Sequence, residues 1–213
     1  MTLRKRPGGI TRGPWTIHAE RVTYDNPWMR VREFDVTQPD GKPSIYGVME
    51  PKNLAIGILP LFGDGSVMLV GQYRFALDCW SWELPEGGGP MDEAPLDSAR
   101  RELAEETGLS AANWLEFLEM DMSNSITNER AIAFIAWNLQ EGEAEPEGTE
   151  DIETRRVPFS TALAEAMDGR IRDAFTLAML LKADYMARHG QLPEAVSRLI
   201  LNPAGKDDPH GLR

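Results

Sequence analysis

The sequence predicts an α/β fold in two parts, an N-terminal antiparallel β subdomain and a larger domain in which strands and helices alternate. Apolar and polar residues alternate, as in half-buried strands, over residues 15–24, 29–36 and 44–50. Two following runs, 54–61 and 67–72, are continuously apolar, which is typical of strands covered on both faces. Helical spacing of apolar residues begins near residue 94.

The N-terminal subdomain is expected to cover residues 1–50 as a β meander, with the turn Pro39-Asp40-Gly41 before its last strand. Residues 1–13 carry a short basic cluster and then Pro7 and two glycines, where a secretory signal would need a long apolar run. We therefore expect a loose N-terminus.

The larger domain is expected to span residues 51–205, followed by a polar tail at 206–213. Its glycine triplet at 87–89 predicts a turn into a helix over residues 94–107, because Pro95 suits the first helical turn and Gly108 suits the residue after the end. Further strands are expected near residues 114–121, 130–139 and 152–157. Helices are expected at 160–167 and 174–188, with a short one possible from residue 192 onward.

The composition argues against several classes of function. The chain has 213 residues, 42% hydrophobic and 26% charged, as in an ordinary globular protein. Its formal charge of -12 argues against a nucleic-acid partner, and a phosphate-bearing substrate would need a cation as mediator. No apolar run approaches the ~20 residues that cross a bilayer, so we expect no membrane association. The single cysteine, Cys79, permits no internal disulfide, which fits a cytoplasmic location.

Three glutamates form a candidate metal site. On a helix, Glu102, Glu105 and Glu106 lie at i, i+3 and i+4, so their carboxylates project from one side. Three like charges destabilise an isolated helix, whereas Mg²⁺ takes oxygen ligands and bridges carboxylates to phosphates. Any single glutamate is most simply a solvated surface residue. The spacing of all three favours a magnesium site, with Mn²⁺ as a possible substitute.

The residues around these glutamates resemble the Nudix box. Gly87 is followed after five residues by Glu93 and, after seven more, by residues 101–109 (RELAEETGL), which matches every fixed position of that motif. The resemblance implies a Nudix-type α/β/α sandwich with a mixed sheet, and a Mg²⁺-dependent hydrolase of pyrophosphate bonds. It implies metal binding by the carbonyl of Glu86 together with the three glutamates, of which Glu105 and Glu106 are also expected to be catalytic. Glu93 and Arg101 are expected to be a structural pair.

Residues 71–74 (GQYR) and 82–87 (WELPEG) look like the segment before the box in the ADP-ribose pyrophosphatase and nucleoside-diphosphate-sugar branch of this family. That resemblance implies that Arg74 contacts a substrate phosphate and that Glu83 assists at the metal site or the terminal sugar. The N-terminal β extension is similar too, and in such proteins it helps to form a homodimer. Tyr46 is a candidate to stack against the base.

In the same branch a loop glutamate acts as general base. Glu150 aligns best with it, and Glu147 and Asp151 are close enough to compete. ADP-ribose hydrolases usually carry a proline about fifteen residues after the box, which residues 122–127 (MSNSIT) lack. We therefore expect a nucleotide-sugar substrate, with ADP-ribose favoured and GDP-mannose or another nucleoside-diphosphate compound as the alternative. A non-catalytic nucleotide-sugar-binding module is the rival of another class.

Overall fold

The computed structural model describes residues 4–142 and 151–202. Within them the chain forms two compact units, divided after Leu54, and residues 121–130 join the first unit. The expected boundary at residues 50 and 51 lies close to this division. The expected polar tail, 206–213, lies outside the described residues.

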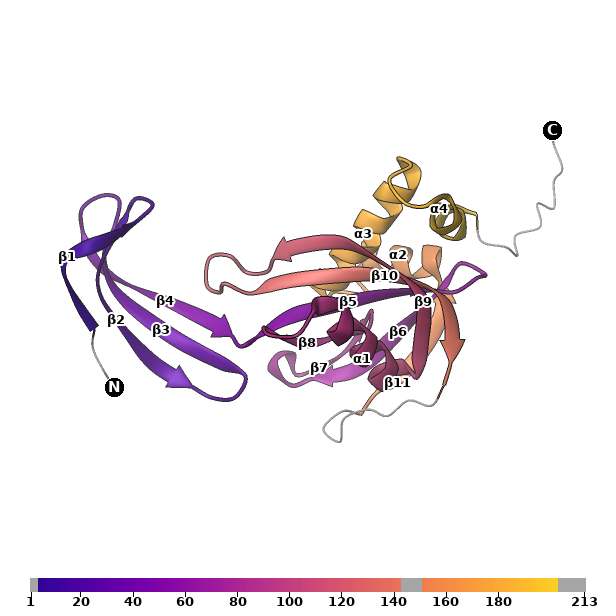
Figure 1. The fold of residues 1–213 in the computed structure, drawn as a ribbon, viewed down its shortest axis with the longest axis horizontal. Coiled ribbons are helices and arrows are strands. Elements are labelled where there is room, and N and C mark those ends of the chain that lie inside the picture. The colour runs from indigo at the N-terminus through magenta and orange to yellow at the C-terminus, as the bar shows by residue number, and fades with distance from the viewer. Residues whose placement is uncertain (1–3, 143–150, 203–213) are drawn as a thin grey trace. The chain divides into compact units, whose positions relative to one another are not determined.

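The first unit is a four-stranded antiparallel sheet (Figure 1) with the strands in chain order: β1 (Arg4–Arg12), β2 (Trp15–Asp25), β3 (Met29–Thr37) and β4 (Pro43–Pro51). The expectation of a loose N-terminus is wrong for residues 4–12. Their backbone pairs with β2 as an edge strand, with a shift of register between Lys5 and Ile10 and a positive φ of 71° at Gly9. Backbone hydrogen bonds form this strand without an apolar pattern, so its composition did not reveal it.

The second unit contains a mixed sheet with the order β11-β6-β5-β10-β9, in which β5 and β10 are parallel. β7 pairs with β6, and β8 pairs with β5. The strands are β5 (Asn53–Leu61), β6 (Ser66–Arg74), β7 (Cys79–Glu83), β8 (Glu86–Pro90), β9 (Leu109–Asp121), β10 (Arg130–Glu141) and β11 (Glu153–Pro158). The six residues from Ile56 to Leu61 are all buried, as the apolar run predicted.

Helices cover both faces of this sheet, which confirms the predicted sandwich. They are α1 (Pro95–Thr107), α2 (Phe159–Met167), α3 (Ala174–Arg188) and α4 (Glu194–Leu201), besides a 3-10 turn, η1 (Phe75–Leu77). A Cβ added at Gly57 of β5 would meet Phe175 and Met179 of α3. One added at Gly89 of β8 would meet Ile56 of β5 and Ser98 of α1. Because neighbouring strand residues point to opposite faces, Ile56 and Gly57 place α1 and α3 on opposite sides of β5.

The segment before α1 differs from the prediction. The glycine triplet lies inside a strand, β8, and the turn comes after it, at residues 91–93. Pairing with β5 extends this backbone, and the absence of Cβ atoms admits close neighbours at Gly87 and Gly89. The predicted helix is confirmed, with Pro95 in its first turn and Gly108 at its end with φ 68°. None of the helices in the described ranges is long and apolar enough to cross a membrane.

Candidate active site

Two of the three box glutamates lie against the backbone of β8. Glu106 is buried, and its Oε2 accepts a hydrogen bond from the Glu86 N–H at 3.1 Å. The carboxylate of Glu102 lies beside Gly87, where an added Cβ would fall 2.2 Å from the carboxylate carbon. Helix α1 therefore directs these carboxylates at the strand whose Glu86 carbonyl is the expected metal ligand.

Arg101 joins the glutamates to the same strand. Its Nη1 donates to Glu102 Oε1 at 2.8 Å and to Glu105 Oε2 at 3.1 Å, and its Nη2 donates to the Gly88 carbonyl at 3.0 Å. Nη2 also lies 3.8 Å from Glu93 Oε2, as expected for the structural pair. One guanidinium thus offsets part of the repulsion between the helix carboxylates and fixes α1 to β8.

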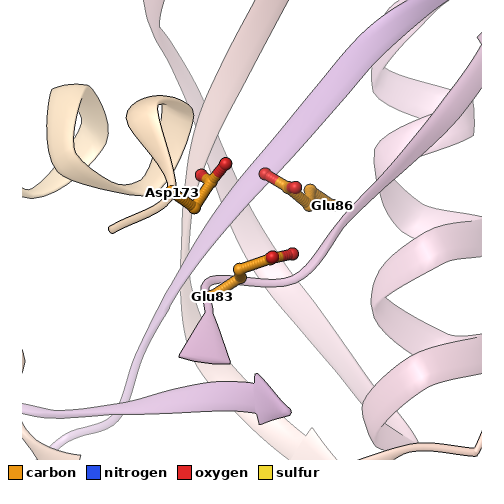
Figure 2. Close-up of side chains that lie close together, drawn as sticks. All are labelled: Glu83, Glu86 and Asp173. Atoms are coloured by element: carbon orange, nitrogen blue, oxygen red, sulfur yellow. The ribbon is translucent and has the colours of Figure 1, made fainter. Parts of the chain in front are cut away.

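A second group of carboxylates consists of Glu83, Glu86 and Asp173. Each offers one oxygen, and these oxygens all lie within 4.8 Å of one another. Figure 2 shows them converging from the end of β7, the start of β8 and the residue before α3. Oxygen ligands at this spacing suit a hard divalent cation.

Arg74 binds this carboxylate group directly. Its Nε donates to both oxygens of Glu83, at 3.0 and 3.1 Å, and its Nη2 donates to Glu83 Oε2 and, at 2.9 Å, to Glu86 Oε1. The other oxygen of Glu86, Oε2, is buried and has no hydrogen-bond partner among the described residues. Three carboxylates and one guanidinium leave this group negatively charged when all are ionised, so its charge favours a further cationic partner.

The environment shifts the pKa values of Glu83 and Glu86 in opposite directions. Burial raises the pKa of Glu86 well above its ordinary value, and the charges of Asp173 and Glu83 raise it further. Burial also acts to raise the pKa of Glu83, but its hydrogen bonds and its charge interaction with Arg74 outweigh this and lower the pKa. In the absence of a bound cation, Glu83 therefore carries the negative charge in preference to Glu86.

Thr176 holds the two sides of this group together. Its hydroxyl accepts a hydrogen bond from the Leu84 N–H at 2.9 Å, and its own N–H donates to Asp173 Oδ2 at 2.6 Å. Thr176 is fully buried. The start of α3 is thus fixed to Leu84, which follows Glu83 at the end of β7 and precedes Glu86 at the start of β8.

The remaining predicted residues are Tyr46 and the carboxylates of the acidic loop. Tyr46 lies in the first unit, where its ring meets Trp15 edge to face at 5.3 Å and its hydroxyl donates to the Ser125 carbonyl at 2.8 Å. Glu147 and Glu150 lie outside the described residues, and Asp151 is exposed. The structure thus brings together the box glutamates, Glu86, Arg74 and Glu83, and it describes Tyr46 within the other unit.

Sequence reasoning missed Asp173. Its position before an apolar helix is typical of a helix cap, and it does cap α3 by accepting the Thr176 N–H. The available signal was residues 169–174 (GRIRDA), which resemble the same branch of the family. Only the folded chain shows that this cap also faces Glu83 and Glu86.

Comparison with known proteins finds a matching family model for each of the two parts of the chain. A family model described as NUDIX domain matches residues 51–178, and one described as nucleoside diphosphate sugar hydrolase N-terminal domain matches residues 15–49. The chain is 28% identical over 167 residues to a CMP-5'-(N-acetyl-N-hydroxy-3-aminopropyl)phosphonate hydrolase of Streptomyces rubellomurinus, covering 78% of this chain and 81% of that protein.

An ADP-ribose pyrophosphatase of Bacillus subtilis is 29% identical over 164 residues, which cover 76% of this chain and 84% of the relative. A solved structure titled "Crystal structure of ADP compounds hydrolase" superposes with a TM-score of 0.74 at 19% identity, covering 90% of this chain and all of that one. At that identity the structural likeness supports the fold alone.

Proposed function

Because the chain belongs to the Nudix family of hydrolases, we propose that it hydrolyses the pyrophosphate bond of nucleoside-diphosphate sugars, with ADP-ribose favoured. Water would add to one phosphorus, and the bond from that phosphorus to the bridging oxygen would break. The products would be a nucleoside monophosphate and a sugar phosphate.

The observation that carries this proposal is the placement of two box glutamates of α1 against the backbone of β8. The carboxylates of Glu102 and Glu106 reach residues 86 and 87, and residue 87 has no side chain to block them. An enzyme of this family needs such oxygen donors beside the substrate diphosphate. A module that only binds nucleotides has no need to retain them, which disfavours the non-catalytic alternative.

The residues fit a divalent metal, which we propose to be Mg²⁺, with Mn²⁺ as a substitute. Glu102, Glu105, Glu106 and the Glu86 carbonyl would hold it, since carboxylate and carbonyl oxygens are the donors that such hard cations take. When bound, the metal would neutralise phosphate charge and acidify water. Arg101 would keep the helix carboxylates oriented through its bonds to Glu102, Glu105 and Gly88.

Arg74 is proposed to hold a substrate phosphate. Its Nε and Nη2 are engaged by Glu83 and Glu86, whereas its Nη1 makes no hydrogen bond with a described residue. The side chain is 34% exposed. Glu83 would therefore fix the orientation of the guanidinium while Nη1 faces a phosphate oxygen, a charge-assisted contact of the stronger kind.

The general base is proposed to be Glu150, which would accept the proton of the attacking water. Its support is the family resemblance of residues 150–153 and the acidity of the loop. We also propose a homodimer, with Tyr46 stacking on the base, on the support of the N-terminal domain match. Sedimentation velocity would test the dimer.

A substrate panel tests the proposal. We expect ADP-ribose, GDP-mannose and related compounds to exceed nucleoside triphosphates in kcat/KM, and turnover without a divalent cation to be negligible. GDP-mannose is included because residues 122–127 lack the proline usual in ADP-ribose hydrolases. A clear preference for triphosphates, with release of inorganic pyrophosphate, would contradict the proposed substrate class.

A further inference from the structure

A hollow of about 300 Å³ adjoins the candidate site. Its walls come from η1, β7 and the segment that leads into α3, and they include Trp80, Glu83, Arg170, Arg172 and Asp173. Glu83 and Asp173 belong to both the hollow and the carboxylate group that includes Glu86. Arg74, which is proposed to hold a substrate phosphate, binds Glu83 directly, so the hollow lies beside that phosphate.

The two arginines of the hollow differ in their partners. Arg170 is engaged by Asp168, at 2.6 Å, and by Glu165, at 3.2 Å. Arg172 is exposed and makes no ion pair or hydrogen bond with any residue that the structure describes. Its charge is thus available to an anionic group that enters the hollow, whereas the charge of Arg170 is already offset.

The backbone on either side of Arg172 is fixed. The N–H groups of Arg170 and Ile171 both donate to the Glu165 carbonyl at 2.9 Å, and the Ile171 side chain is buried. On the other side, Asp173 caps α3. An arginine held between two anchored neighbours loses less freedom on binding than one on a mobile loop, which favours a selective contact.

We propose that this hollow receives the group X of a nucleoside-diphosphate-X substrate, and that Arg172 is a specificity-determining residue that favours an X bearing a second anionic group. Hydroxyl groups of X would donate to Glu83 and Asp173 at the inner wall, and Trp80, which is 39% exposed, would contact the apolar face of a sugar ring. The anionic substituent would lie at Arg172. The proposal rests on the proposed function, whose substrates carry a group X on the diphosphate.

The test uses two substrates that share the nucleotide and the diphosphate, ADP-ribose and ADP-ribose 1″-phosphate. We expect the wild-type protein to prefer the phosphorylated compound in kcat/KM, and Arg172→Gln to reduce that preference about tenfold, the factor that corresponds to ~1.4 kcal/mol. Arg198→Gln is the matched control, because Arg198 is also an exposed arginine but lies on α4 and outside the hollow. It should leave the preference unchanged.

Calorimetry with ribose 5-phosphate and ribose 1,5-bisphosphate separates the two proposals, since binding of these products needs no turnover. Tighter binding of the bisphosphate that Arg172→Gln removes would support the hollow even if the protein hydrolysed neither substrate, an outcome that would refute only the proposed function. An equal effect of Arg172→Gln on both members of each pair, or no effect, would overturn the role of Arg172.

Discussion

Replacing Gly87 with alanine tests whether activity requires the Glu102 carboxylate to lie against the backbone of β8. The new Cβ would fall 2.2 Å from the carboxylate carbon, and ordinary van der Waals contact begins at 3.4 Å, so the carboxylate must retreat by about 1.2 Å (3.4 minus 2.2). The displaced atoms are the end of a flexible side chain, for which an off-rotamer torsion costs ~0.5–1.5 kcal/mol. Reduced freedom of the unfolded chain offsets ~0.4–1 kcal/mol of this.

We therefore expect Gly87→Ala to fold with nearly wild-type stability and yet to lose activity. A displacement of about 1 Å in a reactive constellation can lower the rate ~10²-fold, so kcat/KM for ADP-ribose should fall by at least about that factor. The assay is initial-rate kinetics across a Mg²⁺ titration, with thermal unfolding followed in parallel. The half-saturating Mg²⁺ concentration should rise.

Gly63→Ala is the control, because nothing lies within 4 Å of a Cβ at that turn position and the residue is in the same unit. It should retain both stability and turnover. Wild-type kinetics and Mg²⁺ dependence in folded Gly87→Ala would refute the reasoning, since the metal would then tolerate a displaced Glu102.

Three further substitutions probe the site. Glu106→Gln keeps an acceptor for the Glu86 N–H and removes the charge, so turnover should fall by orders of magnitude with little change in melting temperature, and near-normal turnover would remove Glu106 from the mechanism. Glu150→Gln should lower kcat ~10²–10⁴-fold while metal binding persists. If Glu147→Gln gives that loss instead, the base is Glu147. Thr176→Val leaves a buried N–H without its acceptor and should lower the free energy of unfolding by ~1–3 kcal/mol in denaturant titrations, whereas Thr176→Ser should restore it.

Local patterns predicted most of the fold. The apolar run of β5 and the helical periodicity of α1, with its flanking Pro95 and Gly108, are properties of short segments, and both elements appear within a few residues of the predicted ends. Two predictions failed where pairing with another strand decided the structure. Residues 4–12 form β1 by pairing with β2, and the glycine triplet becomes β8 by pairing with β5. Neither partner can be inferred from the residues of the strand itself.

In the candidate site, too, some features follow from the sequence and others only from the tertiary structure. The sequence by itself determined the box glutamates and their common helix face, because a helical spacing fixes the relative directions of side chains within one element. Tertiary structure alone decided that Glu102 and Glu106 meet β8, that Arg74 is held by Glu83 and Glu86, and that Asp173 completes a carboxylate group with them. These contacts join residues that are up to 90 positions apart along the chain, from Glu83 to Asp173. Their distances depend on how the sheet and helices pack, which no local pattern encodes.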